Sequence, residues 1–121
     1  MKNITLVLGA SLNPNRYSNI AIKRLLDKNY PVVALGQRKG TVLGVAIDDE
    51  KKDYENIDTV TLYLNPERQK DFYDYVISLK PRRVIFNPGA ENEEFVKLLE
   101  SNNIKAEVAC TLVLISIDQY F

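Results

Sequence analysis

The residues best suited to chemistry lie in a polar segment that follows a short apolar run near the beginning of the sequence. Within Gly9–Asn19, Gly9 suits a tight turn at a strand end, where a larger side chain would obstruct a ligand. Ser18 is expected to cap a helix whose first amides face the segment. Those amides favour an anion, and Ser11 adds a hydroxyl group while Arg16 adds a permanently charged donor. The segment predicts an anion site, with an ordinary strand-to-helix turn as the alternative.

Two further polar segments follow apolar runs. Gly36–Gly44 places three glycines around Arg38 and Lys39, which predicts a flexible, positively charged flap. In Asn87–Asn92, a Pro-Gly pair predicts a turn with positive φ at Gly89. Each segment also has a plain alternative, a solvated turn for the first and a strand-to-helix turn for the second. Because all three segments would meet at one edge of a parallel sheet, we favour a binding site.

Several well-known motifs are absent. Only the first glycine of the Gly-x-Gly-x-x-Gly dinucleotide fingerprint is present, and there is no Walker A sequence. Leu35-Gly36-Gln37 stands where an NAD-binding protein usually has an acidic residue, which argues against NAD. The sequence contains no histidine, and its only cysteine is Cys110. Ser-His and Cys-His catalysis are therefore excluded, as is a cysteine-based metal cluster, and we predict neither a catalytic residue nor a metal ligand.

Five short apolar runs must position these segments. They are rich in Val, Ile and Leu, and continuous apolarity is typical of strands covered on both faces. They begin 22 to 28 residues apart, which is the spacing of alternating strands and helices. The predicted strands are Ile4–Leu8, Val32–Leu35, Val60–Leu64, Val84–Phe86 and Ala106–Ala109.

Helical patterns lie between these runs. One apolar stripe follows Ser18, and a second helix is expected to begin at Asn65-Pro66 and to end before Pro81. A third is expected to carry Phe95, with Glu91 and two more glutamates in its first turn. We therefore predict a doubly wound α/β domain of the Rossmann type, with a mainly parallel five-stranded sheet and helices on both faces, over residues 1–121. The apolar tail 110–121 is expected either to close the sheet edge as a short helix or to form an oligomer contact.

Composition sets the remaining limits. Sixteen basic residues balance sixteen acidic residues in 121, so the overall charge favours neither nucleic acid nor an anionic membrane. Any anion must therefore be bound by local groups. The longest apolar run is too short to span a bilayer, and the first residues do not resemble a signal peptide. We expect a soluble, cytoplasmic protein.

The loops also resemble a known family. Val7–Ser11 and Asn13–Ser18 are similar to the opening of the small CoA-binding domain proteins, which are relatives of the CoA-binding domain of the succinyl-CoA synthetase alpha subunit. The similarity continues through Tyr30-Pro31-Val32, Leu43-Gly44-Val45, Ile57–Val60 and Gly89–Glu94. It implies a Rossmann-like fold that holds coenzyme A or an acyl-CoA across the strand ends. The similarity implies ligand binding but not ligase activity, because the catalytic histidine of the synthetase lies outside this domain.

The resemblance also implies which residues contact the ligand. The first loop would contribute most of them, the second-strand loop would hold phosphates and pantetheine, and Asn87 stands where many members have glutamine. These residues are Gly9, Ser11, Arg16, Tyr17, Ser18, Leu35, Gly36, Lys39, Asn87 and Gly89. Two alternatives stay open: an enzyme acting on an acyl-CoA or nucleotide through carboxylates such as Asp48 and Glu91, and a regulatory subunit whose apolar tail contacts a partner.

Overall fold

The computed structural model describes residues 3–121 and has an α/β architecture with one central sheet. The strand order is β3-β4-β2-β1-β5-β6-β7, and every neighbouring pair is parallel except β3 with β4. The strands are β1 (Ile4–Ala10), β2 (Val32–Gly36), β3 (Gly40–Val42), β4 (Val45–Asp48), β5 (Ile57–Leu62), β6 (Arg83–Phe86) and β7 (Lys105–Val108).

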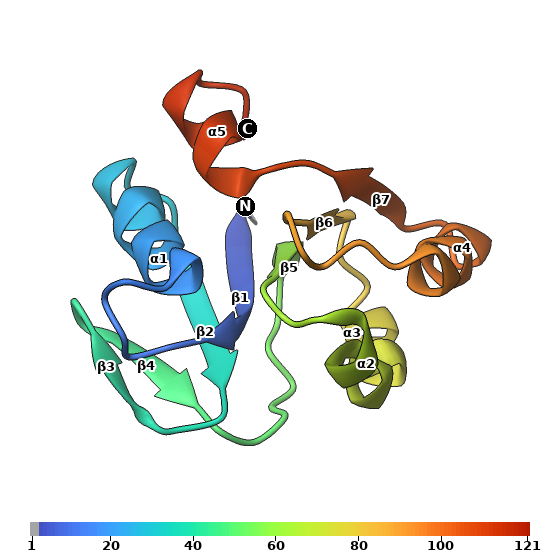
Figure 1. Cartoon of the computed structure of the whole chain (residues 1–121), viewed down its shortest axis with the longest axis horizontal. Helices are drawn as coiled ribbons and strands as arrows, with labels where there is room; N and C mark the ends of the chain where they lie inside the picture. The colour runs from blue at the N-terminus through green and yellow to red at the C-terminus, as the bar shows by residue number, and fades with distance from the viewer. Residues whose placement is uncertain (1–2) are drawn as a thin grey trace.

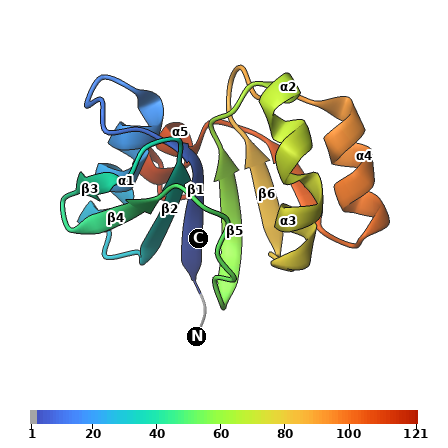
Figure 2. The ribbon, with the colours of Figure 1, turned by 90° about the horizontal axis from the view of Figure 1, so that it is seen from below.

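Helices cover both faces of the sheet. They are α1 (Tyr17–Asp27), α2 (Pro66–Gln69), the 3-10 turn η1 (Lys70–Phe72), α3 (Tyr73–Ser78), α4 (Glu93–Ser101) and α5 (Thr111–Ser116). Figure 1 shows α1 and α5 on one side of the sheet and α2, α3 and α4 on the other. Figure 2 shows β1, β5 and β6 side by side, with α2 and α3 beside β6. The doubly wound arrangement predicted from the sequence is therefore confirmed.

Each face has its own hydrophobic core. On one face, Leu62 and Phe86 of the sheet lie in a cluster with Phe95 of α4. On the other face, Ile85 lies in a cluster with Ile22 of α1 and Ile115 of α5. All five predicted strands are present, with small shifts at their ends. Burial on both faces explains why central strands such as β1 and β6 are mostly apolar, whereas β7 at the sheet edge is less buried and carries Lys105 and Glu107.

The predicted strand number is wrong, because the sheet has seven strands rather than five. The two missed strands form a hairpin, β3–β4, of which β3 lies in the segment Gly36–Gly44 that was predicted to be a flexible flap and β4 follows it directly. Leu43 and Gly44 connect them with φ values of 47° and 86°, as a two-residue hairpin turn requires. Both strands are short, and only one side chain of each is buried, Val42 in β3 and Ile47 in β4. The apolar residues Val45-Ala46-Ile47 of β4 form a run of three that was not predicted to be a strand.

Two predicted helix starts also differ. Asn65 caps α2 as expected, since its side chain accepts a hydrogen bond from the Arg68 amide and Pro66 follows it. In contrast, the N-cap of α1 is Arg16 rather than Ser18, and no side chain caps this helix. Helix α4 begins at Glu93 after the cap Asn92, so Glu91 lies outside its first turn.

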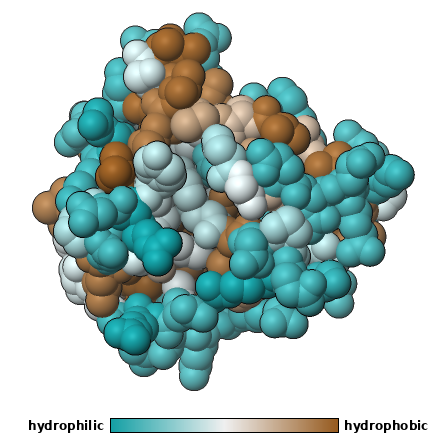
Figure 3. Space-filling view, viewed as in Figure 1, coloured by the Kyte–Doolittle hydropathy of each residue, from teal (hydrophilic) through white to brown (hydrophobic). Residues whose placement is uncertain are grey.

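The tail forms α5, which lies on the same face as α1 rather than at the sheet edge. Ile115 and Tyr120 are buried there, and the Tyr120 hydroxyl lies 2.8 Å from that of Thr5 on the central strand β1. Val113 and Ile117 are exposed, and Figure 3 shows apolar surface over α5. Removing the tail would therefore expose this core. A chain truncated before α5 would lose stability whether or not the tail also contacts a partner.

No helix in the described part of the chain has both the length and the apolarity that crossing a membrane needs.

Candidate functional site

A cleft of about 1070 Å³ opens at the carboxyl ends of β1, β2, β5 and β6. This strand-end cleft lies where the chain order reverses, since β1 stands between β2 on one side and β5 on the other. Ligands of open α/β sheets bind at such a position. Its lining residues are 8–13, 15–18, 35–38, 49, 51, 63–65, 68, 72 and 88–90.

The loop between β1 and α1 is held in shape by its own polar groups. The Ser11 hydroxyl accepts a hydrogen bond from the Asn13 amide at 3.0 Å, and the Asn13 side chain accepts one from the Asn15 amide at 2.9 Å. The buried side chain of Asn19 donates to the Ser11 carbonyl at 2.9 Å. The loop is thus fixed from below by α1, with its outer surface on the cleft.

The first turn of α1 leaves amides for a ligand. The amides of Asn19 and Ile20 both bond the Arg16 carbonyl, at 3.1 Å. Those of Tyr17 and Ser18 have no acceptor within residues 3–121, and both residues line the cleft. Ser18 is buried, whereas Tyr17 is 69% exposed. Because no side chain caps the helix, its N-terminus remains open to an anion.

Two glycines bring the strand ends close together. Gly9 has a φ of 95°, as the predicted turn requires, and a Cβ there would lie 2.8 Å from the Tyr63 backbone. A Cβ at Gly36 would lie 2.2 Å from the Ala10 carbonyl oxygen. The neighbours that exclude larger side chains are therefore the adjacent strand ends. These glycines shape the floor of the cleft rather than leaving room for the ligand directly.

The cleft is locally basic although the chain is neutral. Arg16, Arg38, Lys51 and Arg68 line it, against Asp49. Lys51 is already engaged, since its ammonium group donates to the Asp71 carbonyl at 2.6 Å and lies 5.0 Å from the centroid of the Phe72 ring.

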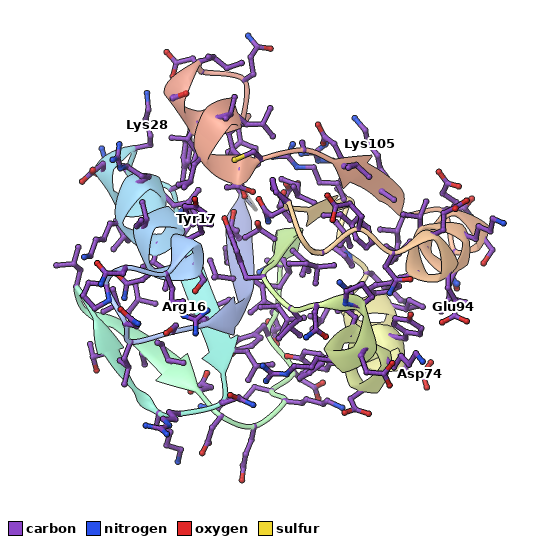
Figure 4. All side chains as sticks on the ribbon, viewed as in Figure 1. Arg16, Tyr17, Lys28, Asp74, Glu94 and Lys105 are labelled. Atoms are coloured by element: carbon purple, nitrogen blue, oxygen red, sulfur yellow. The ribbon has the colours of Figure 1, made fainter. Side chains whose placement is uncertain are left out.

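The arginines differ from Lys51. Within residues 3–121, the guanidinium groups of Arg16, Arg38 and Arg68 have neither a hydrogen-bond acceptor nor an ion-pair partner, and all three residues are exposed. They come from three separate segments, after β1, after β2 and in α2. Figure 4 shows Arg16 on the loop that leads into α1. Guanidinium groups converging from three sides suit a ligand with several phosphates.

Two residues implied by the resemblance lie outside the lining. Lys39 is exposed on the hairpin, 3.9 Å from the Asp49 carboxylate. Asn87 is 3% exposed and donates to the Thr61 hydroxyl at 2.7 Å and the Leu62 carbonyl at 2.9 Å. Its side-chain oxygen accepts from the Thr111 amide at 2.8 Å. Asn87 therefore joins β5, β6 and α5, and no part of its amide faces the cleft.

The other residues implied by the resemblance are brought together along the cleft. Gly89 has a φ of 94°, as predicted, and its amide donates to the Glu91 carboxylate at 2.8 Å. The remaining members of this group in the lining are Gly9, Ser11, Arg16, Tyr17, Ser18, Leu35 and Gly36.

Sequence reasoning missed the contribution of the segment after β5. Tyr63, Asn65 and Arg68 line the cleft from this segment. The signal was available, because Asn65-Pro66 marks a helix start directly after a strand, at the same sheet edge as the three segments that were considered. The resemblance implied Lys39 as a ligand contact, whereas it is the neighbouring Arg38 that lines the cleft.

The carboxylates considered for catalysis already have partners. Tyr54 donates a hydrogen bond to Asp48, and Lys52 lies 2.9 Å from the same carboxylate, so the pKa of Asp48 is held below its usual value. Glu91 accepts the Gly89 amide. Burial raises the pKa of Tyr63 to about 12, so this phenol stays protonated at neutral pH. Residues 3–121 contain no group of three or more His, Cys, Asp or Glu side chains that could hold a metal ion.

Comparisons with known proteins agree with this geometry. A solved structure described only as an uncharacterized protein is 45% identical, with a TM-score of 0.95 and 98% of each chain covered. A Thermus thermophilus protein is 20% identical, with a TM-score of 0.82 over 98% of this chain and 90% of that one. No curated protein matches the chain.

A larger protein contains a similar fold. The dinucleotide-forming acetyl-coenzyme A synthetase 1 of Candidatus Korarchaeum cryptofilum, solved with phosphate and ADP, is 15% identical, with a TM-score of 0.73. The match covers 90% of this chain and 26% of the synthetase. The model of the family described as CoA binding domain matches residues 3–116. With its strand-end cleft and its sequence match, the chain belongs to the CoA binding domain family.

Proposed function

We propose that this protein binds coenzyme A or an acyl-CoA in the strand-end cleft, without chemical turnover of its own. The observation that carries the proposal is that the guanidinium groups of Arg16, Arg38 and Arg68, around the open N-terminus of α1, have no partner among residues 3–121. Coenzyme A carries a diphosphate and a separate ribose phosphate, so it offers anionic groups at more than one place. NAD offers only its diphosphate.

The lining of the cleft supports a position for each part of coenzyme A. The diphosphate would lie at the Tyr17 and Ser18 amides, where the helix dipole favours negative charge. The arginines would bind the phosphate oxygens that project from it. Leu35, Leu64 and Ala90 supply apolar lining for the adenine and the pantetheine arm. The family match and the synthetase that shares this fold support the choice of coenzyme A.

Binding without turnover is proposed because the carboxylates available for acid–base chemistry are occupied. The Asp48 carboxylate is held by Tyr54 and Lys52, and Glu91 is held by the Gly89 amide. A general base must lie within hydrogen-bond reach of the proton that it takes, and neither Asp48 nor Glu91 is among the residues that line the cleft.

The test is calorimetric titration of the purified protein with coenzyme A, acetyl-CoA, dephospho-CoA, ATP and NAD. We expect binding by the CoA compounds, weaker binding of dephospho-CoA, and no comparable binding of NAD. Absence of binding by a folded protein would contradict the proposal. Equal affinity for ATP and coenzyme A would replace it with a general adenine-nucleotide site.

A further inference from the structure

The outer edge of β7 carries unpaired backbone groups. The amides of Lys105 and Ala109 point inward, since they donate to the Arg82 and Phe86 carbonyls of the neighbouring segment, each at 3.2 Å. Successive residues of a strand point their backbone groups to opposite sides. The amide and carbonyl groups of Ala106 therefore point outward, where the described part of the chain offers no strand to pair with.

The side chains on this edge have a regular arrangement of charge. Lys105 and Glu107 lie on the face of the sheet that carries Arg83, whereas Ala106 lies on the opposite face. The Arg83 guanidinium, which is buried, lies 3.3 Å from the Glu107 carboxylate. Lys105 is exposed and has no ion-pair partner within residues 3–121, and Figure 4 shows it on β7. The edge thus presents a cation and an anion two residues apart on one face.

We propose that a second copy of this chain pairs with this edge, with its β7 antiparallel to the first and with Ala106 opposite Ala106. The two Ala106 residues would then exchange amide-to-carbonyl hydrogen bonds, as a hydrogen-bonded antiparallel pair does. The Val108 amides would donate to the Ile104 carbonyls of the other copy. The central sheets of the two copies would join into one, and neither β7 would remain an edge.

Charge selects this register among the symmetric ones. With Ala106 at the centre, Lys105 stands directly opposite Glu107 of the second copy in both directions. A shift of the centre to Glu107 would put two carboxylates opposite each other, which destabilises a strand pair. The chosen register extends the existing ion pair into a row that runs from Arg83 through Glu107 to Lys105 of the other copy.

The association is expected to be modest. A pairing along one short strand is smaller than the standard interface of roughly 1,600 Å², so we expect a dissociation constant on the order of micromolar. None of the β7 residues lines the strand-end cleft, so coenzyme A affinity is expected to be independent of the assembly. Failure of one proposal leaves the other unaffected.

Sedimentation equilibrium of the full chain at about 100 μM tests the proposal. Wild type is expected to be mainly dimeric, and the Ala106→Pro variant monomeric. Proline removes the outward amide of Ala106 and leaves the inward ladder of Lys105 intact, so the melting temperature should change little. Lys80→Glu is the control for charge variants of β7, since it makes the same change of charge as Lys105→Glu away from β7 and should remain dimeric.

A charge exchange tests the register itself. Lys105→Glu alone places glutamates opposite each other, and Glu107→Lys alone places lysines opposite each other, so each variant should be monomeric. An equimolar mixture restores opposite charges in both directions and should form a heterodimer. Amide hydrogen exchange provides a readout without substitution, because the Ala106 and Val108 amides should gain protection as wild-type concentration rises.

Three results would overturn the proposal. The first is a monomeric wild type at about 100 μM whose Ala106 amide exchanges at the same rate at every concentration. The second is a folded Ala106→Pro variant that dimerises as tightly as wild type. The third is a mixture of folded charge variants that gives no heterodimer.

Discussion

The carboxyl ends of β1 and β6 occupy equivalent places in the fold, yet the polar groups at the two ends differ in whether they have partners. At the end of β1, the Tyr17 and Ser18 amides and the Arg16 guanidinium face an open cleft without acceptors in the described chain. At the end of β6, every polar atom of the Asn87 side chain is bonded within the protein, and α5 covers it. Position at a strand end is therefore insufficient to make a site. The polar groups must also be left without internal partners.

The largest effect is expected at the floor of the cleft, where β1 and β2 end. Gly36→Ala places a Cβ 2.2 Å from the Ala10 carbonyl oxygen, so β1 and β2 must separate. We expect a loss of about 3 kcal/mol in the free energy of unfolding and at least a roughly tenfold loss of coenzyme A affinity. Urea denaturation and calorimetry measure the two effects.

Gly89→Ala is the matched control for this change. Its Cβ meets open space, and only the φ of 94° opposes it, so the cost should be about 1–2 kcal/mol. If the two variants lost equal amounts of coenzyme A affinity and of unfolding free energy, the close approach at Gly36 would not shape the cleft.

At the end of β6, Asn87→Ala should lower the free energy of unfolding without lowering the affinity for coenzyme A. The change leaves the buried Thr111 amide and the Leu62 carbonyl without partners, which costs about 3 kcal/mol. Urea denaturation should show this loss, while coenzyme A affinity stays within about twofold at a temperature where the variant is folded.

Asn102→Ala is the control for the Asn87 change, because Asn102 also donates to a carbonyl but is exposed. It should cost less than about 1 kcal/mol. A selective loss of coenzyme A affinity in folded Asn87→Ala would erase the distinction between the two strand ends.

In the cleft, Arg38→Gln and Arg68→Gln should lower the affinity for coenzyme A without lowering the free energy of unfolding. Each removes a charge-assisted contact worth about 1.5–3 kcal/mol, which corresponds to a roughly 10- to 150-fold loss of coenzyme A affinity. Because neither guanidinium has a partner in the described part of the chain, the free energy of unfolding should change by less than about 0.5 kcal/mol.

Comparing coenzyme A with dephospho-CoA sharpens this prediction. A variant that loses affinity for coenzyme A but not for dephospho-CoA identifies the arginine that contacts the ribose phosphate. Arg24→Gln, an exposed change on α1 outside the cleft, should leave both affinities unchanged. Undiminished affinity in both the Arg38 and the Arg68 variants would remove the electrostatic basis of the proposed site.

The smallest effect is a change in the pH dependence of stability, and it is expected at Asp48, at the end of β4. Hydrogen bonds from Tyr54 and Lys52 lower the pKa of Asp48, so its ionised form stabilises the folded state. This contribution is present above the unfolded value of 3.8 and is lost as the pH falls through the lower folded value. The stability of Asp48→Asn should therefore fall less steeply in acid than that of wild type, as thermal unfolding at a series of pH values would show.

Asp74→Asn, which changes an exposed carboxylate on α3, is the control for the acid series. It should follow the wild-type pH dependence. If Asp48→Asn follows it too, the contacts of Asp48 do not contribute to folding.

The sequence predicted the elements whose side chains are buried on both faces. Runs such as Ile4–Leu8 and Val84–Phe86 must be apolar throughout because both cores contact them, and that requirement is visible residue by residue. The β3–β4 hairpin has one positive-φ pair and only two buried side chains, and its single apolar run, Val45-Ala46-Ile47, is short and followed by charged residues, so it was not predicted.

The site divides in a similar way. The loop from Gly9 to Ser18 was predictable because a turn, a helix start and a cation stand together in the sequence. The role of Asn87 was not, because its partners Thr61 and Thr111 are distant in the chain and only the fold brings them to it. An asparagine at a strand end has the same local sequence signature whether it faces a ligand or a buried amide.

The Thr5–Tyr120 hydroxyl contact has a consequence for synthesis. At about 5–20 residues per second, the ribosome adds Tyr120 roughly 6 to 23 s after Thr5. During that interval Ile22 lies on a face whose cover, Ile115 of α5, has not yet emerged. The central strand β1 therefore cannot complete its contacts on this face until the tail has been made.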